Sequence, residues 1–115
     1  MAKASRGEIW EVAFRPSLGA EIQKNRPAVV INVPEVGRLP LCIVVPITDW
    51  KPVFARFSWF VRLAPTAENG LVKESGADAF QVKSVSESRL IRKLGQITFD
   101  QANEIAAAIA LCVGY

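Results

Sequence analysis

The sequence predicts a mainly β protein, a small barrel or sandwich of short strands followed by one C-terminal helix. Three observations support this. The chain has 115 residues, the usual length of one domain. Most of it consists of short apolar segments with a strand period, separated by turns that contain Gly or Pro. Only the end changes to a helical period. We therefore expect residues 1–115 to form a single domain that folds around its own core without disulfides.

The first strands are predicted at residues 7–14 and 27–33. In GEIWEVAF, the side chains of Trp10, Val12 and Phe14 fall on one face, which is typical of a half-buried strand. PAVVINV is a continuous, mostly β-branched run, too short for a helix. Such a run is typical of a central strand that is buried on both faces.

Three further strands are predicted at residues 41–48, 57–63 and 79–85. LCIVVPIT is a second buried run, whereas FSWFVRL alternates apolar and other residues. AFQVKSV repeats this alternation with Phe80 and Val82. Five or more short strands indicate a small barrel or sandwich.

The last segment predicts a helix over residues 99–113. Thr98 and Gln101 have the spacing of a capping box at its start, and Gly114 suits the left-handed position after its end. Between residues 105 and 113 no side chain is polar. Such a helix must be enclosed by the barrel or covered by a second subunit, and for a chain of this size we expect a homodimer.

The absence of histidine excludes several kinds of site. The chain has 14 Lys and Arg, 11 Asp and Glu, a net charge of +3 and no His. A histidine general base, a Ser-His-Asp or Cys-His nucleophile and a histidine-containing metal site are therefore excluded. Cys42 and Cys112 lie in apolar surroundings and are expected to be reduced core thiols. We expect no metal and no cofactor.

The location and the charge distribution suggest the kind of partner. The first residues, MAKASRGE, lack the apolar segment of a signal peptide, and the apolar run at 105–113 is shorter than the ~20 residues that span a bilayer. We expect a cytoplasmic protein. Residues 1–62 hold nine basic and five acidic side chains, so the basic first half favours a polyanionic partner.

Two connections are candidates for the functional site, since small barrels bind ligands at their rims. Residues 15–26 (RPSLGAEIQKNR) form a connection that is long for a hairpin and rich in polar groups. Residues 46–56 combine Trp50 and Phe54 with Lys51 and Arg56. Aromatic rings among cations suit single-stranded nucleic acid, although Trp50 and Phe54 are equally suited to packing.

Five short motifs resemble the MazF/PemK/Kid family of toxin endoribonucleases, in the same order and at similar spacing. The resemblance covers nearly the whole chain. The motifs are RGEIW at 6–10, Pro16 with GAE at 19–21 and RPAVV at 26–30, PIT at 46–48, QVKS at 81–84, and RL at 89–90 with LG at 94–95.

The resemblance implies an SH3-like barrel of the CcdB/Kid/PemK type, a homodimer, and metal-independent cleavage of single-stranded RNA, with mRNA as the target. In the family, cleavage proceeds through a 2′,3′-cyclic phosphate and leaves a 5′-hydroxyl. The resemblance also implies a cognate, MazE-like antitoxin whose acidic tail occupies the RNA groove.

The family's catalytic Arg and Thr fall on Arg26 and Thr48. This agrees with the chemistry, because a guanidinium binds phosphate oxygens bidentately and a hydroxyl adds a donor. Arginine is a poor proton acceptor, so a base is still needed. Glu21 is our first candidate for the base. Alternatively, Glu21 and Gln23 read base edges.

The remaining polar residues of the two connections and of the QVKS motif are expected to bind RNA. They are Gln23, Lys24, Asn25, Asp49, Trp50, Lys51, Arg56, Gln81, Lys83 and Ser84.

The chain also departs from the family pattern. Ala20 replaces a small hydroxyl residue and Ile22 a glutamine, which bears on the bases that are recognised. Lys83 replaces an arginine and Ser84 a threonine; lysine keeps the charge but loses the fork geometry.

Two other functions fit the same fold. CcdB-like toxins use a similar barrel dimer to poison DNA gyrase, and there Arg26 and Thr48 would have no common task. A non-catalytic RNA-binding module is the other alternative. The Arg26-Pro27 and Pro46-Ile47-Thr48 motifs favour the nuclease.

Overall fold

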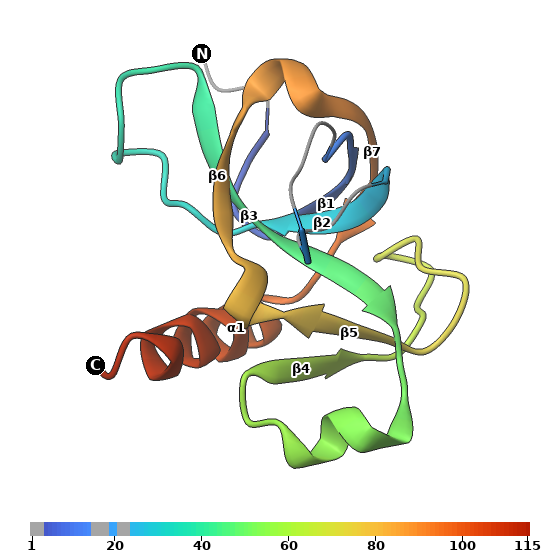
Figure 1. The fold of residues 1–115 in the computed structure, drawn as a ribbon. Coiled ribbons are helices and arrows are strands. Elements are labelled where there is room, and N and C mark those ends of the chain that lie inside the picture. Colours follow the sequence, from blue (N-terminus) through green and yellow to red (C-terminus); the bar gives the residue numbers. More distant parts are fainter. Residues whose placement is uncertain (1–3, 15–18, 21–23) are drawn as a thin grey trace.

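The computed structural model describes residues 4–14, 19–20 and 24–115. Within them a mainly β fold with one C-terminal helix is confirmed (Figure 1). The strands are β1 Glu8–Val12, β2 Arg26–Val30, β3 Leu41–Asp49, β4 Phe60–Leu63, β5 Ser75–Asp78, β6 Lys83–Ser86 and β7 Leu90–Gln96. Three short 3-10 helices, η1 Pro52–Arg56, η2 Ala79–Gln81 and η3 Glu87–Arg89, precede the helix α1 Phe99–Cys112.

The central strand of the sheet is β3. The described strands follow the order β4-β5-β3-β2-β1-β7, and β6 also pairs with β3. All pairings are antiparallel. Along β3, Leu41 to Val44 pair with β6, Val44 to Pro46 pair with β2, and the last three residues, Ile47 to Asp49, pair with β5. In Figure 1, β3 runs from the upper, curved part of the sheet to the lower layer of β4 and β5.

The sheet separates two hydrophobic cores, as the continuous apolar runs predicted. Val29 and Val45 face a core that includes Ile105 of α1. Val30 and Val44, one residue along each strand, face a second core with Phe14. Successive side chains of a strand point to opposite faces, so β2 and β3 are buried on both.

The predicted capping box of α1 is confirmed. Thr98 Oγ1 accepts from Gln101 N at 3.1 Å, and Gln101 Oε1 accepts from Thr98 N at 3.0 Å. Gly114 follows the helix with a φ of +77°. Ala102, Ile105 and Ala108 are buried against the sheet, whereas Leu111 is 51% exposed. The barrel therefore covers one face of the apolar helix and leaves the other face open.

The strand predicted at residues 27–33 ends at Val30, and two other strand predictions are also partly wrong. Residues 79–81 form η2 instead of a strand, because the Asp78 side chain accepts from Phe80 N and turns the chain there. As a result Phe80 is 71% exposed. Residues 57–59 precede the strand, which begins at Phe60. The strands β5 and β7 were not predicted.

The loop between β4 and β5 is docked on β7. Gln96 N donates to Glu68 O at 2.9 Å. A Cβ on Gly70 would overlap the backbone of Leu94, and one on Gly95 would overlap the backbone of Glu68. Glycine at both positions therefore permits this close approach of the two backbones.

The two cysteines are free, as expected, but only Cys42 is buried. Burial, together with the nearby Glu87 carboxylate, raises the pKa of Cys42 to about 11. Its thiol therefore stays protonated at neutral pH and acts as a small core residue. No helix in the described part of the chain is long and apolar enough to cross a membrane.

Candidate active site

Arg26 and Thr48 meet where β2 begins and β3 ends. Ala28 pairs with Pro46 in the antiparallel register, and two residues further along each strand this register brings Arg26 opposite Thr48. Arg26 Nη1 donates a hydrogen bond to Thr48 Oγ1 at 3.2 Å. The structure therefore brings together the two side chains for which the sequence predicts a common task.

Arg26 is held more firmly than an exposed loop charge. The sequence places it in a loop, but it is the first residue of β2 and is half-buried. Its Nε is fully buried and has no hydrogen-bond partner among the described residues. A buried hydrogen-bond donor without a partner lowers the stability of the fold. This guanidinium is therefore suited to bind an anionic ligand.

A hollow of about 240 Å³ opens beside this pair. It lies between the ends of β2 and β3, the β4–β5 loop and β7, and is lined by Arg26, Pro27, Ile47, Thr48, Asp49, Gly70, Leu71, Val72, Lys73, Ser75, Arg92 and Leu94. A larger hollow of about 350 Å³ lies beneath residues 34–41. The smaller one is the better candidate because it contains the paired guanidinium and hydroxyl.

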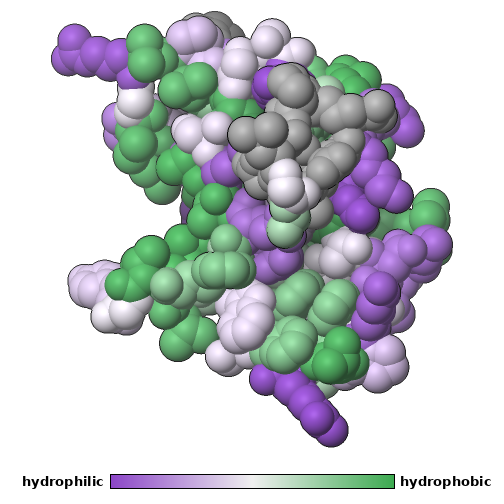
Figure 2. All heavy atoms as spheres, viewed as in Figure 1, coloured by the Kyte–Doolittle hydropathy of each residue, from purple (hydrophilic) through white to green (hydrophobic). Residues whose placement is uncertain are grey.

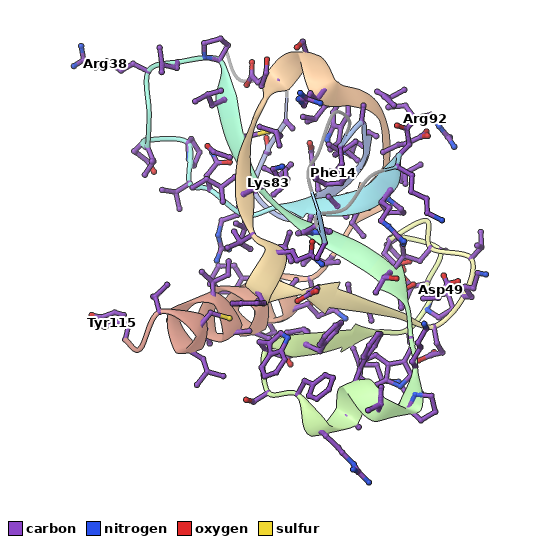
Figure 3. All side chains as sticks on the ribbon, viewed as in Figure 1. Phe14, Arg38, Asp49, Lys83, Arg92 and Tyr115 are labelled. Atoms are coloured by element: carbon purple, nitrogen blue, oxygen red, sulfur yellow. The ribbon has the colours of Figure 1, made fainter. Side chains whose placement is uncertain are left out.

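Two more cations line the same hollow, each beside a carboxylate. Lys73 Nζ lies 3.2 Å from Asp49 Oδ2, and Arg92 Nε lies 3.0 Å from Glu11 Oε1. Asp49 and Arg92 lie along the same edge of the molecule (Figure 3). Figure 2 shows hydrophilic side chains gathered along this edge. The hollow thus has the charge expected of a binding site for a polyanion.

Trp50 is a packing residue in this structure. Its ring lies against Gly76, where a Cβ would meet Trp50 Cε3 at 3.0 Å. It makes an edge-on contact with Phe54, with ring centroids 5.7 Å apart, and the Arg62 guanidinium lies 5.0 Å from its centroid. Packing, one of the two uses that the sequence left open for Trp50 and Phe54, is therefore present in the structure, and contact of Trp50 with RNA stays a prediction.

Lys51 and Arg56 lie away from the hollow. Lys51 precedes η1 and Arg56 ends it, and both are exposed. Neither lines the hollow beside Arg26.

The QVKS motif lies on η2 and β6. Gln81 Nε2 donates to Asp78 Oδ2 at 3.2 Å. Lys83 pairs with Val44 and Ser84 with Ile43, so the Lys83 side chain shares the face of β3 that carries Thr48. Thr48 lies four residues beyond Val44, the partner of Lys83, so Lys83 and Thr48 are separated by roughly 13 Å along β3. Figure 3 shows Lys83 well apart from Asp49.

The first connection is described only in part. Lys24 and Asn25 are exposed and directly precede Arg26. Glu21 and Gln23 lie outside the described residues.

Sequence reasoning missed Lys73, Ser75 and Arg92, which line the hollow. Lys73 belongs to a polar loop and Arg92 to a strand with mostly exposed residues. No local pattern distinguishes them from ordinary surface charges, because only the pairing of distant strands brings them to Arg26.

Comparison with known proteins agrees with this geometry. A family model described as "PemK-like, MazF-like toxin of type II toxin-antitoxin system" matches residues 5–113. Endoribonuclease MazF9 of Mycobacterium tuberculosis (strain ATCC 25618 / H37Rv) is 31% identical over an alignment of 113 residues, and the match covers 92% of each chain.

Solved structures show the same fold. MazF (Form-I) from Deinococcus radiodurans has a TM-score of 0.80 and 21% identity, and the match covers 97% of both chains. An endoribonuclease in complex with its cognate antitoxin, from a mycobacterial species, has a TM-score of 0.70 and 16% identity, covering 96% of this chain and 95% of the other. With the family model matching nearly its whole length, the chain belongs to the PemK-like, MazF-like toxins of type II toxin-antitoxin systems.

Proposed function

We propose that the protein is a sequence-selective endoribonuclease that cleaves single-stranded RNA, mRNA above all, without a metal ion. The observation that carries the proposal is the 3.2 Å hydrogen bond between Arg26 and Thr48 at a hollow lined by cations. The family assignment supports the same activity.

The reaction is an attack of a 2′-hydroxyl on the neighbouring phosphorus. A bond from O2′ to phosphorus forms and the bond to O5′ breaks, which gives a 2′,3′-cyclic phosphate and a 5′-hydroxyl. Negative charge grows on the non-bridging oxygens, and fixed donors directed at them supply much of the catalysis. Arg26 provides two parallel donors and a permanent charge, and Thr48 provides a hydroxyl.

Proton transfer needs a group other than Arg26, because a guanidinium has no acceptor for the proton of the 2′-hydroxyl. We keep Glu21 as the candidate base that accepts the proton of the 2′-hydroxyl. In the alternative, Glu21 and Gln23 read base edges.

The remaining proposed RNA contacts fall into three groups. Lys24, Asn25 and Asp49 are within one or two residues of the catalytic pair in sequence, whereas Lys83 and Ser84 extend the site along β3 toward β6. Gln81 on η2 and the residues that follow Asp49, namely Trp50, Lys51 and Arg56, would contact flanking nucleotides.

We further propose that the protein acts as a homodimer in the cytoplasm, where its RNA substrate is found, and that a cognate, MazE-like antitoxin inhibits it. An acidic antitoxin segment would compete with RNA for the cations around the hollow. The expected result of adding such an antitoxin is loss of cleavage.

The proposal is tested by incubating the protein with end-labelled single-stranded RNA in EDTA. Discrete fragments that end in a cyclic phosphate support it. Intact RNA together with stalled DNA gyrase would instead identify a CcdB-like poison, and RNA that is bound but intact would identify a non-catalytic RNA-binding module.

Arg26→Ala is expected to lower the cleavage rate by roughly a hundredfold or more, since it removes the main transition-state donor. Its melting temperature should stay within a few degrees of the wild type, because the unpartnered buried Nε leaves with the side chain. Arg38→Ala is the matched control, since Arg38 is exposed, does not line the hollow, and lies far from the lining residues Asp49 and Arg92 (Figure 3). Equal cleavage by both variants would remove Arg26 from the mechanism.

A further inference from the structure

A second cation reaches the hollow of Arg26 from a part of the chain that no motif singles out. Lys73 lies in the loop between β4 and β5 and lines the hollow together with Arg26 and Thr48. Its side chain is 64% exposed, and its Nζ lies 3.2 Å from Asp49 Oδ2. The ammonium is therefore accessible to a ligand in the hollow while one neighbour orients it.

The loop that carries Lys73 is fixed on both sides. On one side, Glu68 and Gly70 are docked against β7. The buried Asn69 accepts from Thr66 N and Leu71 N through Oδ1 and donates to Ala64 O.

On the other side, Trp50 N donates to Glu74 O at 3.0 Å. This bond ties the residue after Lys73 to the chain just beyond β3. A cation on such a loop is held near its binding position before the ligand arrives, so less conformational entropy is lost on binding.

The ion pair between Lys73 and Asp49 does little for stability. Both side chains are about two-thirds exposed, and exposed pairs of this kind are worth little. The pair matters more for charge: Asp49 directly follows Thr48, and an uncompensated carboxylate there would repel a phosphate. An ammonium has three donors, so Lys73 can contact a phosphate oxygen and Asp49 together.

We propose that Lys73 binds a phosphate of the RNA in this hollow, in addition to the phosphate contact of Arg26, and that Asp49 positions it. This inference rests on the proposed function and names a further substrate-binding residue for it. It assigns Asp49 the task of orienting Lys73 instead of direct contact with a base.

The test measures binding of an oligodeoxyribonucleotide that has the sequence cleaved in the RNA assay. This probe keeps the phosphates and lacks the attacking 2′-hydroxyl, so it is bound without being cleaved. Dissociation constants are determined at several salt concentrations. The affinity falls as the salt concentration rises. For single strands, each lost phosphate contact reduces the magnitude of the slope of log affinity against log salt by about 0.7.

Lys73→Ala is expected to weaken binding at low salt roughly tenfold and to reduce the magnitude of the salt slope by about 0.7. Lys73→Arg should restore both. Lys73→Gln serves as a second neutral variant in case alanine disturbs the loop. The matched control is Lys93→Ala, because Lys93 is also an exposed lysine in an ion pair, at 3.1 Å with the partly buried Glu8, but does not line the hollow.

Asp49→Asn separates the two roles of that residue. Asparagine keeps an oxygen that can accept from Lys73 Nζ and loses the negative charge, so if Asp49 only orients Lys73, binding at low salt should be unchanged or tighter. A loss of binding that occurs only when Lys73 is present also supports the positioning role. Weaker binding of Asp49→Asn in the Lys73→Ala background as well would show a direct contact with the nucleic acid and overturn the positioning role.

Equal salt slopes for Lys73→Ala, Lys93→Ala and the wild type would overturn the role of Lys73. A wild-type protein that leaves RNA intact would instead overturn the proposed function itself, so the two failures are distinguishable.

Discussion

At the scale of single residues, Glu8 shows how one carboxylate joins three segments. Its Oε1 accepts from Ser5 N and from Trp10 Nε1, both at 3.0 Å, and its Oε2 lies 3.1 Å from Lys93 Nζ. Burial raises the pKa of Glu8, but these hydrogen bonds and the Lys93 charge outweigh burial and lower the pKa below its usual 4.5. The ionised form therefore stabilises the folded state.

Glu8→Gln is expected to lower the free energy of unfolding at pH 7 by about 1 kcal/mol. Because the folded-state pKa is depressed, this contribution is complete above pH 4.5 and is lost as the pH falls through the folded-state value. Urea unfolding at pH 7 and at pH 3 measures the difference, which should be smaller at pH 3 than at pH 7. Glu35→Gln, at an exposed position, is the control. An equal difference between wild type and Glu8→Gln at both pH values would contradict the prediction.

At the scale of the elements, the start of α1 depends on its capping box. Thr98→Ala removes the acceptor for Gln101 N and should cost about 1 kcal/mol of stability. Thr98→Ser keeps the hydroxyl and should cost much less. Thermal unfolding followed by circular dichroism measures both, and equal losses for the two variants would show that the cap contributes little.

The docking of the β4–β5 loop predicts different effects at two glycines with positive φ. Gly37 has a φ of +86° and open space around it, whereas Gly70 has a φ of +69° and faces the backbone of Leu94. Gly37→Ala should cost about 1 kcal/mol through backbone strain alone. Gly70→Ala should cost about 3 kcal/mol or more, because the loop must also move away from β7. Similar losses in denaturant unfolding would mean that the loop is not held there.

Local sequence was a good guide to elements with a clear apolar pattern. The runs around Val29 and Val45 and the capped helix were predicted because burial on two faces and capping leave strong local signals. The strand β5 (SGAD) has no such signal, since it is buried through small residues such as Gly76 that lie beneath Trp50 and Phe60. The strand β7 is mostly exposed, and its charges pair with β1.

The candidate site was predictable to the same extent. Thr48 ends a strand that the apolar pattern identifies, Arg26 directly precedes another predicted strand, and the motif resemblance singles both residues out. Lys73 and Arg92 reach the hollow only through the docking of a loop and the pairing of β7 with β1, and no stretch of sequence around them encodes these long-range contacts.

At the scale of the whole molecule, the exposed face of α1 bears on the predicted homodimer. Leu111 is 51% and Val113 is 77% exposed. A second copy that covers this face would bury them. The native protein should therefore have twice the 12.6 kDa mass of the chain in light-scattering measurements.

Leu111→Glu is expected to weaken the dimer at least tenfold, since it places a charge in an apolar contact. Glu104→Gln, at an exposed polar position of the same helix, should leave the dimer intact. Sedimentation at a series of concentrations measures both. A monomeric wild type would contradict the homodimer, and an intact dimer of Leu111→Glu would show that the subunits meet through another face.

The position of β3 between two cores has one more consequence. A strand that is paired along its length and packed on both faces is among the last parts of a fold to open during local fluctuations. Thr48 sits near the end of that strand, and its partner Arg26 begins the neighbouring one. We therefore expect substitutions around the rim of the hollow to leave the position of the Arg26–Thr48 pair unchanged.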